Sequence, residues 1–282
     1  MYAGDFSAKG RASFYARQQF FCILNLFGKE ISNKLFYEIR NESKKFFFKE
    51  HKMTERTIFT GQIAEVSEKR AFLTRVYGWM TAALAVSGLT AFLTAHNPAL
   101  IKMLLGGGFI AVVIAELALV WVLSRMIRRM SASAALFAFI AYSILNGLTL
   151  SFAFLAYANA AITRVFFISA AMFAAMTVYG MKAKSDIRSA GRYLQMALIG
   201  VIIASVVNLF LHSSGLDWLI SIATVVVFTG LTAYDTNKMM IAAERADGSD
   251  MFKKAAVIGA LELYLDFINI FLALLRLFGR RK

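Results

Sequence analysis

Seven apolar stretches of about 20 residues constrain the fold of this chain more than any other feature. They cover residues 72–95, 100–123, 132–157, 165–181, 193–211, 218–240 and 255–278. A stretch of this length matches one helical crossing of the hydrocarbon core of a bilayer. Because the backbone polar groups of a lipid-exposed segment must be satisfied internally, each stretch is expected to be an α-helix. The sequence therefore predicts an all-α polytopic membrane protein with seven transmembrane helices.

The composition agrees with a membrane protein and gives no sign of a bound metal or a disulfide. Hydrophobic residues make up 59% of the 282 residues, and the charged residues gather in short clusters between the apolar stretches. The one cysteine, Cys22, cannot form an internal disulfide, and the histidines His51, His96 and His212 lie far apart in the sequence. Structural zinc sites need clustered Cys and His ligands. We therefore expect no cofactor.

The net charge of +14 is interpreted as an orientation signal and not as a nucleic-acid footprint. Basic residues concentrate before the first apolar stretch and in the loops 124–131, 182–192 and 241–254, whereas the alternate loops hold few. Lys and Arg in short loops mark the cytoplasmic side of inner-membrane helices. We therefore expect the lipid bilayer and not nucleic acid as the partner of this surface, an inner-membrane location, and a cytoplasmic N-terminus.

The basic tail 280–282 conflicts with this orientation. Seven crossings would place it outside, against the positive-inside rule. Either packing against the other six helices holds the last helix across the membrane, or the last helix dips in and returns. The sequence leaves both alternatives open.

The charge pattern divides the chain into three parts. Residues 1–70 form a basic N-terminal extension that is expected to be disordered or to lie on the membrane surface. Residues 71–279 form the seven-helix domain, and residues 280–282 the tail. A second interpretation is that translation starts at Met53 and that residues 1–52 are absent from the native protein.

Two carboxylates lie inside apolar stretches, where ionisable groups are costly and usually functional. Asp235 belongs to the sixth stretch and Asp266 to the seventh, at nearly equal distances from a predicted turn at 247–250 (DGSD). In an antiparallel helical hairpin, equal distance from the turn means equal depth. The two carboxylates are therefore expected to meet and to titrate as one coupled pair. The alternative is that each only hydrogen-bonds a neighbouring helix.

Further polar residues could extend this pair into a path. Glu262, Asp266 and Asn269 follow one another at four- and three-residue spacing, which places them on one helix face. Glu116 lies in the middle of the second stretch. Such oxygen ligands suit hard cations such as calcium, with Asp235 and Asp266 as the candidate ligands. A structural interhelical hydrogen bond is the competing interpretation for each of the supporting residues.

Three arginines, Arg125, Arg128 and Arg129, lie at the predicted cytoplasmic end of the second stretch. One of them could reach Asp235 with its long side chain and form a salt bridge that shuts the path. Protonation of the aspartate pair would weaken that contact, which would make it a pH switch.

Four short segments resemble a known family. They are RVYGWM (75–80), AYDTNKM (233–239), LYLDFINIF (263–271) and LLRLFG (274–279). Over residues 70–279 the chain is similar to the Bax inhibitor family, the transmembrane Bax-inhibitor-motif proteins, and to bacterial members in particular. The resemblance implies a seven-helix bundle with the last helix in its centre and a pH-sensitive calcium leak in a bacterial plasma membrane.

The resemblance also implies roles for particular residues. Asp235 and Asp266 match the two-aspartate pH sensor of the family within their motifs, and Glu116 corresponds to a family glutamate. The family uses an arginine late in the second helix as a latch, for which Arg128 is the candidate and Arg125 its rival, because the alignment there is imperfect.

Three functions from different classes remain in view. The first is the ion channel, with calcium flowing down its gradient, since the chain has no nucleotide-binding loop. The second is a regulatory protein that modulates a membrane-bound ATP-dependent protease, to which bacterial relatives are linked. The third is an intramembrane aspartyl protease. The Gly-x-Gly-Asp and Pro-Ala-Leu motifs of that class are missing, and Pro98 is the only proline, so we expect no enzyme.

Overall fold

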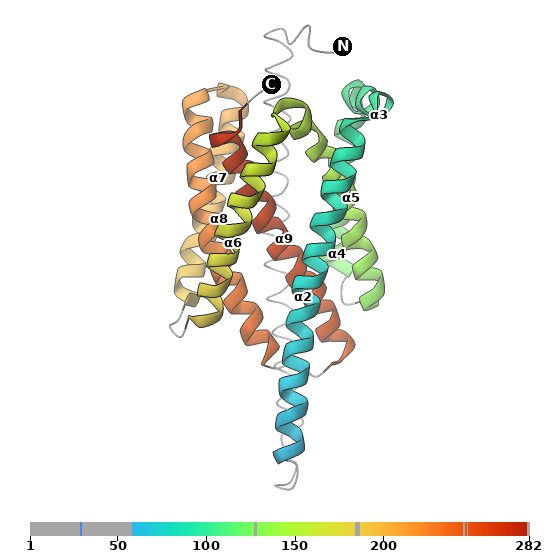
Figure 1. Cartoon of the computed structure of the whole chain (residues 1–282), viewed down its shortest axis with the longest axis vertical. Helices are drawn as coiled ribbons and strands as arrows, with labels where there is room; N and C mark the ends of the chain where they lie inside the picture. The colour runs from blue at the N-terminus through green and yellow to red at the C-terminus, as the bar shows by residue number, and fades with distance from the viewer. Residues whose placement is uncertain are drawn as a thin grey trace.

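The computed structural model describes residues 29, 58–126, 129–183, 187–244, 246 and 248–280 of the chain. Within these residues, helices follow one another from α2 to α9 (Figure 1). Their bounds are α2 (Ile58–Ala95), α3 (Pro98–Met103), η2 (Leu104–Gly108), α4 (Phe109–Met126), α5 (Ala132–Ala156), α6 (Asn159–Lys182), α7 (Ile187–Leu211), α8 (Ser214–Ala243) and α9 (Asp250–Phe278).

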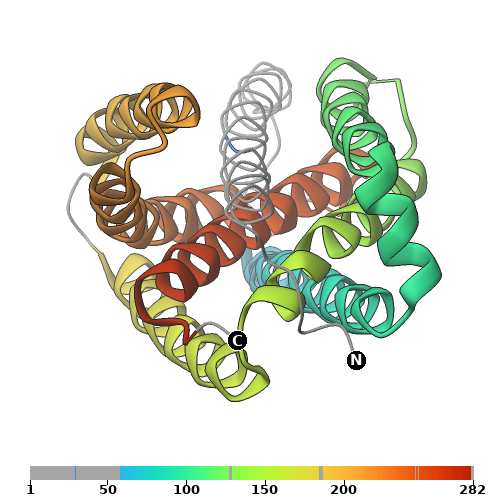
Figure 2. The ribbon, with the colours of Figure 1, turned by 90° about the horizontal axis from the view of Figure 1, so that it is seen from above.

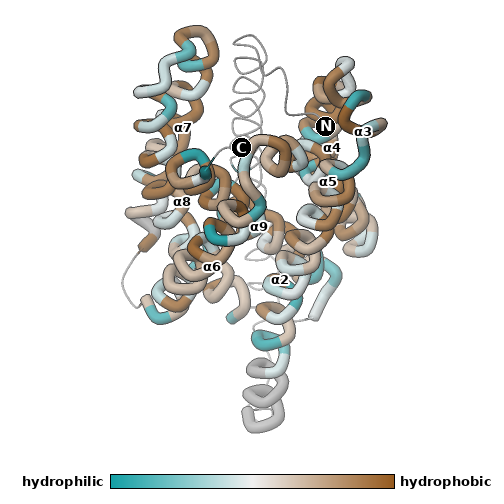
Figure 3. The backbone as a smooth tube through the Cα atoms, turned by 45° about the horizontal axis from the view of Figure 1, so that its top comes forward, coloured by the Kyte–Doolittle hydropathy of each residue, from teal (hydrophilic) through white to brown (hydrophobic). Residues whose placement is uncertain are grey.

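Seven segments in the described part of the chain are long and apolar enough to cross a membrane, as the sequence predicted. They are Ser67–Ala95, Pro98–Leu123, Ala132–Ala156, Asn159–Lys182, Ala190–Leu211, Ser214–Ala243 and Asp250–Phe278. Large apolar side chains point away from the bundle, among them Phe137, Phe167 and Phe210, and hydrophobic residues run along the length of the helices (Figure 3). This outer apolar surface is the one expected to face lipid.

Three predicted spans differ clearly from the structure. The first helix, α2, begins at Ile58 and not at residue 72. The fourth starts at Asn159 and not at residue 165, because the exposed Arg164 is tolerated near a helix end, where a long side chain can reach the membrane interface. The second is not one regular helix. Gly106 and Gly107 leave helical geometry in η2, and Gly107 has φ 113°, a conformation that favours glycine.

The turn between α8 and α9 lies where the sequence predicted it. α8 ends at Ala243, Gly248 has φ 73°, and Ser249 is the residue that precedes α9. Glycine at the left-handed position allows the chain to reverse without a steric penalty. The two helices therefore form the antiparallel hairpin on which the equal depth of Asp235 and Asp266 depends.

α9 lies in the centre of the bundle, as expected. Figure 2 shows it crossing the middle of the molecule, and it packs against α2, α5, α6 and α8. Every residue from Ala255 to Leu275 is buried, so the helix has no lipid-facing side there. A helix that is hydrophobic all round is the kind that can occupy such a place.

The last helix, α9, crosses the bundle and does not turn back within it. It is one continuous helix, and at its far end the carbonyl of Arg280 accepts a hydrogen bond of 3.0 Å from the backbone N–H of Ala158, in the α5–α6 connection. That connection lies at the opposite end of the bundle from the α8–α9 turn (Figure 1). The last helix therefore spans the bundle from end to end.

The predictions for the N-terminal extension concern residues outside the described part of the chain, except for Lys29 and for residues 58–70. Residues 58–70 are helical and belong to α2, so the expected disorder is wrong for them. For the residues before them, a disordered or surface-lying extension and a start at Met53 stay predictions. Lys29 itself is described and has a fully buried side chain.

Candidate functional site

Asp235 on α8 and Asp266 on α9 meet at the ammonium group of Lys29. The side chains of all three residues are fully buried. Lys29 Nζ forms a salt bridge with Asp235 Oδ2 and lies 2.6 Å from Asp266 Oδ1. It also donates a hydrogen bond of 3.1 Å to the backbone carbonyl of Glu262. The structure thus brings the two predicted carboxylates together, at the same depth in the bundle.

A second lysine joins the same group of side chains. Lys238 lies one helical turn after Asp235 on α8, and its Nζ is 3.2 Å from Asp235 Oδ1. The same ammonium lies 2.6 Å from Glu262 Oε2, on α9. Glu262 is one turn before Asp266, so i, i+4 spacing places both carboxylates on one helix face, as the sequence predicted.

We refer to Asp235, Glu262 and Asp266 as the carboxylate cluster. When all five groups are ionised, this cluster and the two lysines together carry a formal charge of −1, since three carboxylates face two ammonium groups. Charges taken out of water are tolerated when they are paired and hydrogen-bonded. Asp266 Oδ2 and Glu262 Oε1 nevertheless have no hydrogen-bond partner among the described residues. The cluster therefore retains acceptor capacity.

The cluster as it stands is a network of ion pairs and not a preformed metal cage. Within the described residues, no group of three or more His, Cys, Asp or Glu side chains is arranged to hold a metal ion. The lysine ammonium groups lie where a cation would bind the carboxylates. Calcium at Asp235 and Asp266 therefore stays a prediction.

A separate polar cluster lies where α9 meets α2 and α5, and it extends through α5 to α4. The hydroxyl of Tyr264 donates a hydrogen bond of 2.9 Å to Asn146 Oδ1 and lies 2.7 Å from Ser87 Oγ. Nearby, Thr149 Oγ1 donates to Glu116 Oε1 at 3.1 Å. Tyr264 is two residues from both Glu262 and Asp266 along α9, so it projects toward a different side of that helix. Glu116 thus belongs to this second cluster and not to the first.

Comparison of the sequence with known protein families shows to which family this chain belongs. The family described as "Inhibitor of apoptosis-promoting Bax1" matches residues 69–282 of the chain. The chain belongs to the Bax inhibitor family. The matched region of this family member contains the whole carboxylate cluster, but it does not contain Lys29.

Individual relatives agree with this assignment. The inner membrane protein YbhL of Escherichia coli is 44% identical over 217 residues, which are 76% of this chain and 93% of the relative. A protein of Borreliella burgdorferi is 40% identical over 226 residues, 79% of this chain and 97% of the relative. A protein of Deinococcus radiodurans is 41% identical over 225 residues, 78% and 97% of the two chains. With its seven spans, this Bax inhibitor family member is an integral inner-membrane protein, and no enzymatic activity is named for these proteins.

The side chains of the predicted arginine latch lie outside the described part of the chain. Arg128 is outside the described residues, and the side chain of Arg125 is also outside them. The cations that contact Asp235 among the described side chains are the two lysines. The latch role of either arginine in this family member stays a prediction.

The last predicted polar residue has a local role. Asn269 Nδ2 donates a hydrogen bond of 2.8 Å to the carbonyl of Leu265, one turn earlier on α9. This contact lies within one helix, so the interhelical hydrogen bond considered for Asn269 stays a prediction.

The two lysines are the site residues that the sequence analysis missed. Lys238 had a signal, because it lies three residues after Asp235 inside an apolar span, where a lysine needs a partner. Lys29 had none, since it precedes Asp235 by 206 positions and the residues around it form no recognisable motif. Only the tertiary structure places it.

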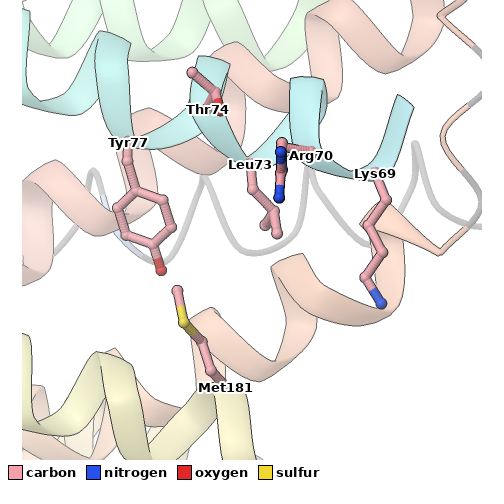
Figure 4. Close-up of a pocket in the computed structure, with 6 residues that line it drawn as sticks. All are labelled: Lys69, Arg70, Leu73, Thr74, Tyr77 and Met181. Atoms are coloured by element: carbon pink, nitrogen blue, oxygen red, sulfur yellow. The ribbon is translucent and has the colours of Figure 1, made fainter. Parts of the chain in front are cut away.

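A groove of about 460 Å³ on the α2 side of the bundle is separate from both clusters (Figure 4). Its lining residues are Lys69, Arg70, Leu73, Thr74 and Tyr77 of α2 with Met181 of α6. Lys69 pairs with Glu244 at 3.6 Å, and both side chains are solvent-accessible. None of the three cluster carboxylates lines this groove.

Proposed function

We propose that this protein is a passive, pH-sensitive cation leak, with calcium as the permeant ion and with Asp235 and Asp266 as ion site and pH sensor. The observation that supports the proposal most directly is the convergence of the two fully buried carboxylates on a single ammonium group. In a membrane protein, acidic side chains at such a place are typical of ion or proton pathways. The N-terminus is proposed to be cytoplasmic, from the distribution of basic loops.

The chemistry of the carboxylate cluster supports a cation and not an anion. Its three acids outnumber the two lysines that contact them among the described residues, and two carboxylate oxygens have neither a hydrogen-bond partner nor an ion-pair contact there. Carboxylate oxygens are the preferred ligands of calcium. A cation that replaced one of the ammonium groups would keep the buried carboxylates compensated.

The same contacts supply a mechanism for pH sensing. The groups that face Asp235 are Lys29, Lys238 and, through the shared ammonium groups, Glu262 and Asp266. When a carboxylate takes up a proton, its attraction to a lysine or to a bound cation is lost. Because the carboxylates share their ammonium partners, protonation of one changes the environment of the others. Flux through the site is therefore expected to change with pH.

Calcium flux in liposomes tests the proposal. The full chain is reconstituted in vesicles with an enclosed calcium dye, and flux is followed over a series of pH values. The double variant Asp235→Asn, Asp266→Asn is expected to lose both the flux and its pH response. Asp217→Asn, at the start of α8 and 3.6 Å from Arg276, is the matched control. A double variant that conducts like the wild type at every pH would contradict the proposal.

The same preparation addresses the two alternatives from the sequence. Cleavage of a labelled transmembrane peptide that stops in Asp266→Asn would assign the aspartates to an intramembrane protease. An ATP-dependent membrane protease that co-purifies from detergent, with no flux in vesicles, would favour a regulatory role.

A further inference from the structure

Lys29 fills the centre of the carboxylate cluster although it lies outside the family region. The family match begins at residue 69. Lys29 Nζ nevertheless contacts Asp235 Oδ2, Asp266 Oδ1 and the carbonyl oxygen of Glu262, and its side chain is fully buried. An ammonium group has three N–H donors, and three oxygen atoms of α8 and α9 surround this one: two accept hydrogen bonds and the third, Asp266 Oδ1, forms an ion pair.

The charge of Lys29 decides what else the cluster can bind. With Lys29 present, the ionised cluster and its lysines carry a formal charge of −1. Without Lys29, the three carboxylates would face Lys238 as their one cation among the described side chains, and the charge would be −2. A buried charge of this size needs a compensating cation. Lys29 therefore occupies the place and supplies the charge that a bound calcium ion would otherwise supply.

We infer that the Asp235–Asp266 centre is a binding site for a primary ammonium group and that Lys29 is its built-in ligand, in competition with the permeant cation. The inference rests on the proposed function only in naming that cation. Lys29 then acts as an internal inhibitor of the leak, and the cation must displace it to reach the carboxylates. A ligand that excludes another from one site lowers the apparent affinity for the second by mass action.

Two roles of Lys29 make different predictions. A lysine that only stabilises the bundle would, on removal, leave a less stable protein with an unchanged response to calcium. A competing lysine would, on removal, leave a protein that calcium stabilises and that conducts faster. The response to calcium therefore separates the two roles, whereas stability alone does not.

The first experiment compares the full-length wild type with Lys29→Gln in vesicles and in detergent. Lys34→Gln, which removes the same charge five positions later, is the control. We expect Lys29→Gln to conduct calcium about tenfold faster, a usual scale for coupling between ligands, and its unfolding temperature to rise with added calcium. Wild-type flux and an unchanged calcium response in Lys29→Gln would overturn the inference.

The second experiment replaces the lost ammonium group from solution. Lys29→Ala removes the side chain, and n-butylammonium offers the same alkyl stem and three donors. We expect n-butylammonium to raise the unfolding temperature of Lys29→Ala, to lower its flux toward the wild-type rate, and to leave the wild type unaffected. Tetramethylammonium, which has the charge but no N–H donor, should have little effect. Equal effects on the variant and the wild type would contradict an ammonium site.

A third measurement uses the wild-type protein, so its result does not depend on whether a variant folds. Lysine acetylation of the wild-type protein, read by mass spectrometry, should label Lys29 slowly without calcium and faster as calcium is added. A labelling rate that calcium leaves unchanged would overturn the competition.

These readouts separate failure of the inference from failure of the proposed function. The absence of calcium flux in the wild type and in every variant would overturn the proposed leak. Stabilisation of Lys29→Ala by n-butylammonium would support the ammonium site even then. Calcium flux that depends on Asp235 and Asp266 but not on Lys29 would support the proposed leak and would overturn the inference about Lys29.

Discussion

Lys238 of α8 and Glu262 of α9 form an ion pair of 2.6 Å between Nζ and Oε2 inside the membrane-spanning bundle. The Glu262 side chain is fully buried and that of Lys238 is 7% exposed. The pair joins the two arms of the hairpin beside Asp235, which the same lysine also contacts. It therefore links the stability of the hairpin to the charge of the carboxylate cluster.

Breaking this pair from one side is expected to cost stability. Lys238→Met leaves Glu262 and Asp235 with one fewer cation, and removal of one partner of a buried pair costs about 3–5 kcal/mol. The double variant Lys238→Met, Glu262→Met should lose less than the sum of the two single losses. Unfolding in detergent for all four proteins measures the difference. Additive losses would show that the two side chains are not coupled.

Asp235 is expected to matter more for stability than Asp266. Asp235→Asn weakens contacts with two ammonium groups, whereas Asp266→Asn weakens a contact with one. A hydrogen bond to a charged group contributes about 1.5–3 kcal/mol, so the free energy of unfolding should fall further in Asp235→Asn, by an amount on this scale. Denaturant titrations of the two variants in the same detergent measure it. An equal or reversed order would contradict the contacts described above.

The hydroxyl of Tyr264 is expected to stabilise the bundle without acting in the leak. Tyr264→Phe removes the contacts with Asn146 and Ser87, which should lower the free energy of unfolding by about 1–3 kcal/mol. The pH response of the flux should be unchanged, because the hydroxyl contacts none of the three cluster carboxylates. Tyr179→Phe, at an exposed tyrosine, is the control. A lost pH response in Tyr264→Phe would instead place this tyrosine in the path.

Gly180 is expected to set the distance between α6 and α8. A Cβ atom at Gly180 would collide with the backbone carbonyl of Ala233, two residues before Asp235. Because backbone cannot move aside as a side chain can, Gly180→Ala should destabilise the protein by about 1–3 kcal/mol. Gly200→Ala has open space around its Cβ and should stabilise its helix by about 0.5–1 kcal/mol. Thermal unfolding of both variants checks the contrast, and equal shifts would contradict it.

The proposed inhibition by Lys29 requires that the native protein contains this residue. A chain that started at Met53 would lack it, and Lys238 would be the one described lysine left in contact with the carboxylate cluster. N-terminal sequencing of the protein from its natural membrane decides between the two starts. A first residue at Met53 would remove Lys29 from the native site and with it the proposed inhibition.

The sequence by itself determined the architecture and the three acidic residues of the site. Spans of about 20 apolar residues must be helices in lipid, so the seven crossings followed from hydropathy. Asp235 and Asp266 could be matched in depth because the turn at Gly248 and the helical rise fix distance along a hairpin. Hydropathy, turn residues and helical rise depend only on residues that are near one another in the chain, so the sequence alone is enough to apply them.

Only the tertiary structure decided which cations face the carboxylates. The sequence assigned that role to an arginine of the second span, whereas the described contacts come from Lys238 and from Lys29, which is 206 positions before Asp235. Likewise, hydropathy could not show that Gly107 breaks the second span or that Glu116 and Tyr264 belong to a different cluster. An ion pair forms between groups that the whole fold brings within a few ångströms, and its energy depends on burial that no short segment encodes.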